Sequence, residues 1–292
     1  MYQHLIGMST GFRKMEYTWR DMALYALGVG TSVDELHYAY EKNMKAIPTF
    51  ATLPCNSAVN VYPQRPTTYP AVFFVRDFIE RTTGVTAKSM HMSSAFRYFR
   101  PLDAIKGSLV FEEKVIDVYD WGAKGLVVKT TMYIYDEAGR AVAEIDACNS
   151  LSASGGYDGK PVPKSAVVFP DCEPDIVDDA YMTENQHLLY RLSGDVHPAH
   201  VDPDTAKEYG QPGPFMQGLC SYGYACRMAI KALIPGEPER MTAMDAQMRS
   251  IVFPDTEIQF QGWKMSDGEL YFKLVNKKTG KAILDKGVFN WK

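Results

Sequence analysis

The amino-acid sequence predicts an α+β fold that is built twice, with antiparallel strands wrapping a helix in each part. The first observation is a repeated order, because helical segments precede segments of β-branched, partly alternating residues in both parts of the chain. The second is a stretch rich in glycine, serine and proline at residues 152–165, whose composition favours an exposed connector. We therefore expect one repeat over residues 1–151 and another over residues 166–292.

The first repeat opens with a predicted helix. Thr18 and Asp21 have the spacing of a capping box, and Gly28 is placed to end the helix. Residues 71–82 predict a second helix before Gly84, although their opening letters, AVFFV, are equally typical of a strand. The strands of an antiparallel meander are then expected at residues 107–118, 125–135 and 141–151.

The second repeat follows the same order. A short helix is expected at residues 205–209 and a long one at residues 215–234. Turns through Ser266-Asp-Gly268 and Lys278-Thr-Gly280 separate the later β-patterned segments. The expected strands cover residues 243–253, 256–263, 269–276 and 282–291.

Composition and charge exclude several classes of protein. The chain has 292 residues, 46% of them hydrophobic, and a formal net charge of −4, without a run of Lys or Arg that would bind nucleic acid. No uninterrupted apolar stretch reaches the roughly 18 residues of a membrane-spanning helix, so we expect no membrane partner.

The termini and the cysteines bear on localisation. The N-terminus lacks the apolar segment of a signal peptide, and the C-terminus lacks a peroxisomal Ser-Lys-Leu tail. The cysteines are odd in number and scattered without a CxxC pair, which predicts reduced thiols and a cytoplasmic protein. They are Cys55, Cys148, Cys172, Cys220 and Cys226.

One segment concentrates groups that can move protons. Residues 195–202 hold two carboxylates and two imidazoles, and prolines within and after them stiffen the backbone. A histidine that titrates near neutral pH beside a carboxylate suits general acid–base chemistry. A metal site formed by His197, His200 and Asp195 or Asp202 is the weaker interpretation, because Pro198 breaks the helix that would align the histidines and zinc sites usually have a recognisable fourth ligand elsewhere. Asp202, before Pro203, is expected to cap the following helix.

This segment resembles the signature of the hydratase 2 (MaoC-like) family. Ser193-Gly-Asp195, Pro198 and His200 stand in the register of that signature, and Pro214 and Gly218 match the start of the family's central helix. Upstream, YALGVG at residues 25–30 and PTF at residues 48–50 resemble the N-terminal repeat of eukaryotic-type (R)-specific 2-enoyl-CoA hydratases. The resemblance covers most of the chain and implies a double hotdog, with two helix-wrapped antiparallel sheets in one polypeptide.

The family resemblance also implies an activity. A hydro-lyase of this family adds water to a trans-2-enoyl-CoA to give the (3R)-hydroxyacyl-CoA, reversibly, as in the β-oxidation of fatty acids. Asp195 and His200 match the catalytic pair, and Gly218 matches the residue whose backbone N–H polarises the thioester carbonyl. No metal or other cofactor is implied, because CoA is part of the substrate. The first repeat would then accommodate the acyl chain, and a homodimer of the whole chain remains open.

Two departures from the family pattern affect the expected substrate. His197 replaces the family's asparagine and Gln217 replaces its histidine, and with Pro198 both are expected to contact substrate. These replacements leave two alternatives open. One is a dehydratase for an unusual acyl-CoA, such as a branched, aromatic or sterol-derived one. The other is a hotdog protein that binds acyl-CoA without turning it over.

Four further residues are candidates for substrate contact. His91 lies where the family's first repeat has a substrate-contacting histidine, and Lys124 would meet a CoA phosphate or simply be solvated. Arg227 would reach a phosphate or pair with a carboxylate. Met248 aligns with an apolar substrate-lining residue, although the 15 methionines of the chain make a core position equally reasonable.

Overall fold

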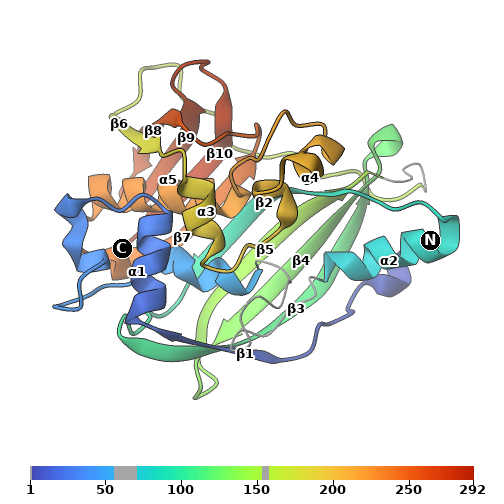
Figure 1. Cartoon of the computed structure of the whole chain (residues 1–292), viewed down its shortest axis with the longest axis horizontal. Coiled ribbons are helices and arrows are strands. Elements are labelled where there is room, and N and C mark those ends of the chain that lie inside the picture. Colours follow the sequence, from blue (N-terminus) through green and yellow to red (C-terminus); the bar gives the residue numbers. More distant parts are fainter. Residues whose placement is uncertain (1, 56–70, 153–157) are drawn as a thin grey trace.

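The computed structural model of the chain describes residues 2–55, 71–152 and 158–292 (Figure 1). The predicted connector at residues 152–165 falls partly on residues 153–157, which lie outside the described residues. Among the described residues, no helix is both long and apolar enough to cross a bilayer. The α-helices are α1 (Trp19–Gly28), α2 (Val72–Thr83), α3 (Gln186–Arg191), α4 (Pro203–Glu208) and α5 (Gly218–Leu233).

The strands form one antiparallel sheet in the order β1-β3-β4-β5-β2-β7-β10-β9-β8-β6. We call the first five strands in this order the first half-sheet and the last five the second half-sheet. The strands are β1 (Arg13–Thr18), β2 (Ser89–Tyr98), β3 (Lys106–Asp120), β4 (Leu126–Tyr135), β5 (Ala141–Leu151), β6 (Ile176–Met182), β7 (Met241–Met248), β8 (Thr256–Ser266), β9 (Glu269–Asn276) and β10 (Ala282–Trp291).

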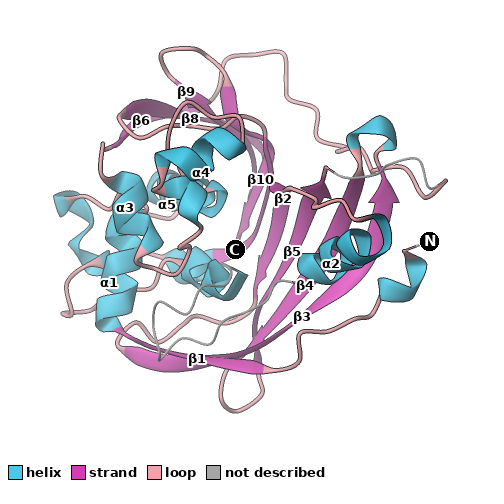
Figure 2. Ribbon diagram, turned by 45° about the vertical axis from the view of Figure 1, so that its right-hand side comes forward, coloured by secondary structure: helices cyan, strands magenta, loops and turns pink. Residues whose placement is uncertain are grey.

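The α+β double hotdog is confirmed, with one correction to its sheets. The two half-sheets are not separate, because β2 pairs with β7 at their shared edge, with Phe96 opposite Met244. Figure 2 shows α1, α3, α4 and α5 gathered beside the second half-sheet, while α2 lies across the first. Side chains from both repeats can therefore contact the same ligand above the paired strands β2 and β7.

The ambiguous segment at residues 71–82 is helical. Val72, Val75 and Ile79 of α2 share one buried face at helical spacing, and Gly84 ends the helix with a left-handed φ of 71°. This face packs on inward residues of β3, β4 and β5 to form a small apolar cluster separate from the main core. The helical period therefore decides the structure, although β-branched residues alone favour a strand.

Helix α5 is the central element of the main core. All twelve residues from Leu219 to Ile230 are buried. A Cβ on Gly223 would lie 2.4 Å from Val29 Cγ1, so only glycine lets α1 approach α5 this closely. The predicted capping box of α1, from Thr18 to Asp21, is present. The first repeat therefore contributes directly to the core around the second repeat's helix.

Four elements escaped the sequence prediction, namely β1, β2, β6 and α3. β2 reads SMHMSSAFRY, and its serines hide the apolar alternation of a strand that lies in the middle of the sheet. The strand predicted at residues 243–253 is too long, because β7 ends at Met248 and Pro254 then precedes Asp255, which has a φ of 61°.

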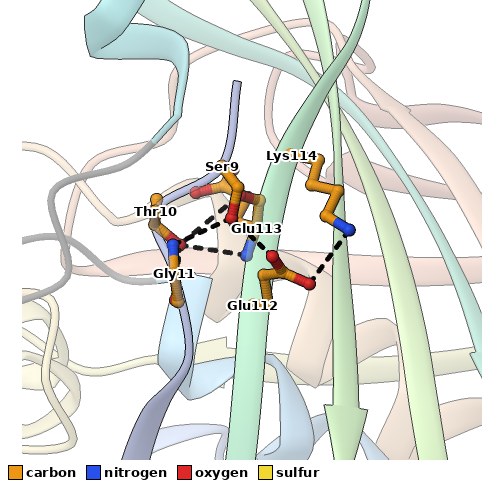
Figure 3. A network of polar contacts seen from close by, with 6 residues as sticks. All are labelled: Ser9, Thr10, Gly11, Glu112, Glu113 and Lys114. Carbon is orange, nitrogen blue, oxygen red and sulfur yellow. Dashed lines mark hydrogen bonds and ion pairs between the residues drawn. The ribbon is translucent and has the colours of Figure 1, made fainter. Parts of the chain in front are cut away.

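The segment before β1 runs beside β3 and fixes which way its side chains point (Figure 3). Ser9 Oγ donates to Glu112 Oε1 at 2.6 Å, and Lys114 Nζ lies 3.1 Å from Glu112 Oε2. The Thr10 backbone N–H donates to the carbonyl of Glu113 at 2.9 Å. Since side chains alternate along a strand, these contacts hold Glu112 on the outer face and direct Glu113 inward.

Candidate active site

A cavity of about 320 Å³ lies between the two repeats. The first repeat supplies residues from α2, β2, β3 and β5, and the second supplies the loop after α3, the start of α5 and the segment after β7. Both walls therefore belong to one site that neither repeat forms by itself. Its lining includes Asp195, His197, His200, Gly218 and Met248.

The loop that carries the acidic and imidazole groups is anchored to the first repeat. Gln186, buried in α3, donates from Nε2 to the carbonyls of Leu27 and Gly28 at 3.0 and 2.8 Å. These carbonyls lie in the last turn of α1, where a helix leaves carbonyl groups without intrahelical partners, and Gln186 supplies a donor to both. The chain then turns at Gly194, whose φ of 137° lies in the region that favours glycine, and delivers Asp195 to the cavity.

A short 3₁₀ helix, Pro198–His200, sets the second half of the loop. His197 Nδ1 accepts from the Ala199 N–H at 3.2 Å and so caps this turn. Asp202 accepts from the backbone of Asp204 and Thr205 at 3.1 and 3.3 Å, which confirms its expected capping of α4. Caps on both sides hold the loop in an irregular but fixed conformation.

Asp195 and His200 face each other within the cavity. Asp195 Oδ2 lies 3.9 Å from His200 Nε2, and their side chains are 17% and 12% exposed. This separation is too long for a direct hydrogen bond and matches a gap that one small donor could bridge.

The tautomer of His200 follows from its other ring nitrogen. Nδ1 lies 2.8 Å from the Phe215 carbonyl oxygen, which can only accept a hydrogen bond. The proton of the neutral imidazole therefore sits on Nδ1, and Nε2 offers a lone pair toward Asp195. The Phe215 ring also packs edge-on against the imidazole at 4.9 Å between centroids. The pair thus presents two hydrogen-bond acceptors at a fixed spacing.

Gly218 is the first residue of α5 and faces the cavity. The first-turn N–H groups of a helix lack intrahelical partners and carry partial positive charge. A Cβ at this position would touch only Met248 Cγ, at the ordinary distance of 3.7 Å. The protein's own packing therefore does not require glycine here, and the missing side chain leaves its space to the cavity.

His197 also lines the cavity, with 5.9 Å between the centres of its ring and that of His200. Its Nε2 is 3.4 Å from the Tyr209 hydroxyl, and its Nδ1 is occupied as the acceptor for Ala199. Burial lowers the pKa of His197, and the nearby His200 and Arg76 lower it further. The neutral imidazole is thus the form that this environment favours.

Comparison with known proteins identifies the family. The second repeat matches the MaoC like domain over residues 167–286, and the first matches the MFE-2 hydratase 2 N-terminal domain over residues 15–149. The 3-hydroxyacyl-thioester dehydratase Y of Mycobacterium tuberculosis is 32% identical over 98% of this chain and 97% of its own length. The chain belongs to the MaoC-like hydratase family.

Further relatives of this MaoC-like protein cover nearly its full length. The probable enoyl-CoA hydratase 2 of Dictyostelium discoideum is 26% identical over 94% of this chain and 92% of its own length. The crystal structure of a MaoC-like dehydratase from Phytophthora capsici superimposes with a TM-score of 0.81 at 29% identity, covering 99% of this chain and 96% of that one.

Six of the site residues predicted from this chain's sequence line the cavity, including His91 from the first repeat. His91 Nε2 lies 3.0 Å from the Ser93 carbonyl and 3.0 Å from Ser94 Oγ. Because the carbonyl only accepts, Nε2 carries the proton, and burial lowers the pKa of this imidazole. The other five are Asp195, His197, His200, Gly218 and Met248.

The remaining four predicted residues do not belong to the described cavity lining. Arg227 is buried, pairs through Nη1 with Glu35 and donates from Nε to the Val29 carbonyl at 2.9 Å, so it pairs with a carboxylate instead of a phosphate. Gln217 is buried and donates to the His187 carbonyl at 3.1 Å. Of the two roles expected for Arg227, the structure therefore fits the pairing with a carboxylate, and the Gln217 side chain makes a contact within the protein instead of lining the cavity.

Pro198 and Lys124 are also corrected. Pro198 begins the 3₁₀ helix that orients its neighbours but lies outside the cavity lining. Lys124 stands in a turn of residues 122–124, with Nζ 4.8 Å from the centre of the Trp121 ring. The two roles expected for Lys124 were contact with a CoA phosphate and solvation in a turn. Its position fits the second role, because a cation on an aromatic face needs no phosphate partner.

The sequence prediction missed Arg76, Glu113, Tyr209 and Arg249, which also line the cavity. Arg76 and Glu113 belong to α2 and β3, far from the catalytic loop in the sequence. Arg249 directly follows Met248, which was already a candidate, and this adjacency was the one signal in the sequence that could have indicated Arg249. In the described parts of the chain, no three or more His, Cys, Asp or Glu side chains converge on a point where a metal ion could bind.

Proposed function

We propose that this chain is an (R)-specific 2-enoyl-CoA hydratase and 3-hydroxyacyl-CoA dehydratase, with Asp195 and His200 as its catalytic residues. The relatives named as enoyl-CoA hydratase 2 and 3-hydroxyacyl-thioester dehydratase support this reaction class. The observation that carries the residue assignment is the pair of facing acceptors, 3.9 Å apart, in the cavity beside the amino end of α5.

In the hydration direction, the substrate water would lie between Asp195 Oδ2 and His200 Nε2 and donate a hydrogen bond to each. One of these groups takes a proton as the water oxygen attacks C3 of the enoyl thioester. The electron pair of the double bond moves through C2 to the thioester oxygen. The captured proton is then returned to C2 on the same face, so both groups end in their starting states. Dehydration follows the reverse order.

Gly218 would stabilise the negative charge that develops on the thioester oxygen. Its N–H belongs to the first turn of a sixteen-residue helix, where unpaired donors and the helix dipole favour an anion. A preorganised donor of this kind is worth about 3–4 kcal/mol in the transition state. The interaction strengthens as charge develops, so it lowers the barrier more than it tightens substrate binding.

Arg76 and Arg249 supply positive charge to the same cavity. Their side chains are 28% and 55% exposed, and each has a carboxylate neighbour, Asp77 at 3.3 Å and Asp285 at 3.8 Å. Because these contacts are partly solvated, the guanidinium groups can also receive a phosphate of CoA. Their charge supports a thioester of CoA as the substrate class.

Hydration of trans-2-enoyl-CoAs tests the proposal. The loss of the enoyl-thioester absorbance should be followed with crotonyl-CoA and with longer chains, and the configuration of the product determined by chiral chromatography. We expect turnover and a (3R)-hydroxyacyl product. Tight binding of these thioesters without turnover, or a (3S) product, would contradict the proposal and in the first case favour the alternative of a binding protein.

We further propose a cytoplasmic location and a homodimer. The described cysteines Cys148, Cys172, Cys220 and Cys226 are free thiols, which supports a reducing compartment. The sheet leaves β1 and β6 as its two edge strands, where a second copy could add. Microscopy of the tagged chain and analytical ultracentrifugation test the two statements, and a peroxisomal signal or a monomer would overturn them.

A further inference from the structure

The cavity contains a buried carboxylate that the hydration reaction does not use. Glu113 of β3 is 6% exposed and lines the cavity beside Val72 and Phe73 of α2. A carboxylate among apolar groups is unfavourable unless its oxygens find partners.

The protein holds Glu113 through two neighbours, the Ala71 N–H and the Thr130 hydroxyl. Its Oε2 accepts the Ala71 N–H at 2.8 Å, at the start of α2. Burial raises the pKa of Glu113, while the Ala71 N–H and the nearby Thr130 hydroxyl oppose this effect. None of the described Lys, Arg or His side chains forms an ion pair with it. These two contacts hold the carboxyl group in place but do not explain why it faces a substrate cavity.

The position of Glu113 relative to the reaction centre indicates which part of a substrate would reach it. Met248, which touches the Cβ position of Gly218, ends β7, and β3 lies four strands away in the sheet order. With adjacent strands about 4.8 Å apart, this corresponds to roughly 19 Å along the sheet. A group that meets Glu113 therefore belongs to the distal part of a long acyl chain, while the thioester lies at Gly218.

We propose that Glu113 makes the distal part of the cavity selective for acyl chains that carry a hydroxyl group remote from the thioester. This inference rests on the proposed function, since it concerns the substrate of the same site. A hydroxyl donates to the carboxylate and also accepts from the protonated acid, so it satisfies Glu113 in either state. A plain alkyl chain would cover the cavity side of the carboxyl group without offering it a hydrogen bond.

The first test compares end groups with the wild-type enzyme. Two series of trans-2-enoyl-CoAs, one ending in methyl and one in a terminal hydroxyl, are assayed at several matched chain lengths. Each kcat/KM is divided by the value for crotonyl-CoA, which is too short to reach Glu113. At the lengths that span the cavity we expect the hydroxylated chain to be favoured at least about tenfold. A ratio of one or below at every length would overturn the inference.

The second test uses variants of two neighbouring glutamates. Glu113→Leu should lower the hydroxyl-to-methyl ratio to one or below, whereas Glu113→Gln, which keeps an acceptor for Ala71 and a polar group for the hydroxyl, should retain part of the preference. Glu112→Leu is the matched control, because Glu112 lies on the opposite face of β3 with Ser9 and Lys114 (Figure 3). A purely structural role predicts lower thermal stability in Glu113→Leu with an unchanged ratio, and that result would overturn the inference.

The two proposals fail in different ways. An enzyme that hydrates alkyl enoyl-CoAs but shows no preference for hydroxylated chains contradicts the role of Glu113 alone. Absence of hydration with every thioester, including crotonyl-CoA, contradicts the proposed function itself. The wild-type comparison gives this distinction even if Glu113→Leu does not fold.

Discussion

The two repeats have the same five-stranded half-sheet but use their helices differently. Helix α5 of the second repeat is buried along twelve consecutive residues and fills the space inside its half-sheet. Helix α2 of the first repeat buries only Val72, Val75 and Ile79, and residues beside it line the cavity. The second repeat therefore has a packed interior with the proposed catalytic residues beside it, and the first repeat leaves room for a ligand.

This difference suggests how a duplicated fold divides the work of one site. Rigid groups for the chemistry need close support, which α5 and the capped loop around Asp195 and His200 provide. A long acyl chain needs volume, which the shorter, amphipathic α2 leaves free. Variants in each repeat should therefore separate loss of activity from loss of stability.

Loss of the catalytic pair should affect the reaction without affecting the fold. Asp195→Asn and His200→Gln each keep a similar shape but remove a proton-transfer group, so we expect kcat to fall by about 10³-fold in each. Steady-state kinetics with crotonyl-CoA measure this, and circular dichroism verifies the fold. Rates close to those of the wild type in both variants would rule out the assignment.

The packed interior of the second repeat can be tested through its ion pair with the first. Arg227→Met leaves Glu35 buried without its partner, and we expect a loss of about 3–5 kcal/mol in the free energy of unfolding. Urea denaturation gives this value. Adding Glu35→Gln removes the unpaired charge and should recover part of the stability. No change in the single variant would mean that the pair does not hold the repeats together.

Glycines at two positions of α5 should respond in opposite ways. Gly218→Ala adds a methyl group to the cavity, so we expect kcat to fall about 10²-fold while thermal stability stays the same or rises slightly. Gly223→Ala is the matched comparison, because its Cβ would collide with Val29 and lower the stability. Equal activity of Gly218→Ala and the wild type would remove Gly218 from the site.

The smallest expected effect concerns pH. Burial lowers the pKa of His91 and His197 below the usual value of 6.5, so near pH 6 the unfolded chain binds more protons than the folded one. Stability should therefore decrease as the pH falls from 6.5 through the lowered values. His91→Gln should flatten this slope, and thermal melts of the variant and the wild type across this range measure the difference.

Local patterns predicted the elements whose signals lie within a few residues of each other. The Thr18–Asp21 capping box and the long apolar helix have short-range signatures, and both are present in the structure, the helix over Gly218–Leu233. The edge strand β6 and the serine-rich β2 lack such signals, because their partners in the sheet decide their conformation.

The site was less predictable where it depends on packing between distant elements. Arg76 and Glu113 reach the cavity only because α2 lies across the first half-sheet, an arrangement that spacing along the chain does not reveal. Arg227 carries a charge on the central helix and was therefore a candidate for phosphate binding. Its actual partner, Glu35, stands 192 residues earlier in the sequence.

The most direct test of the central assignment is a crystal structure of the Asp195→Asn variant with a bound trans-2-enoyl-CoA. We expect the thioester oxygen at about 3 Å from the Gly218 nitrogen, and C3 facing the gap between His200 and the side chain at position 195. A thioester bound elsewhere, or a C3 atom turned away from this pair, would contradict this assignment.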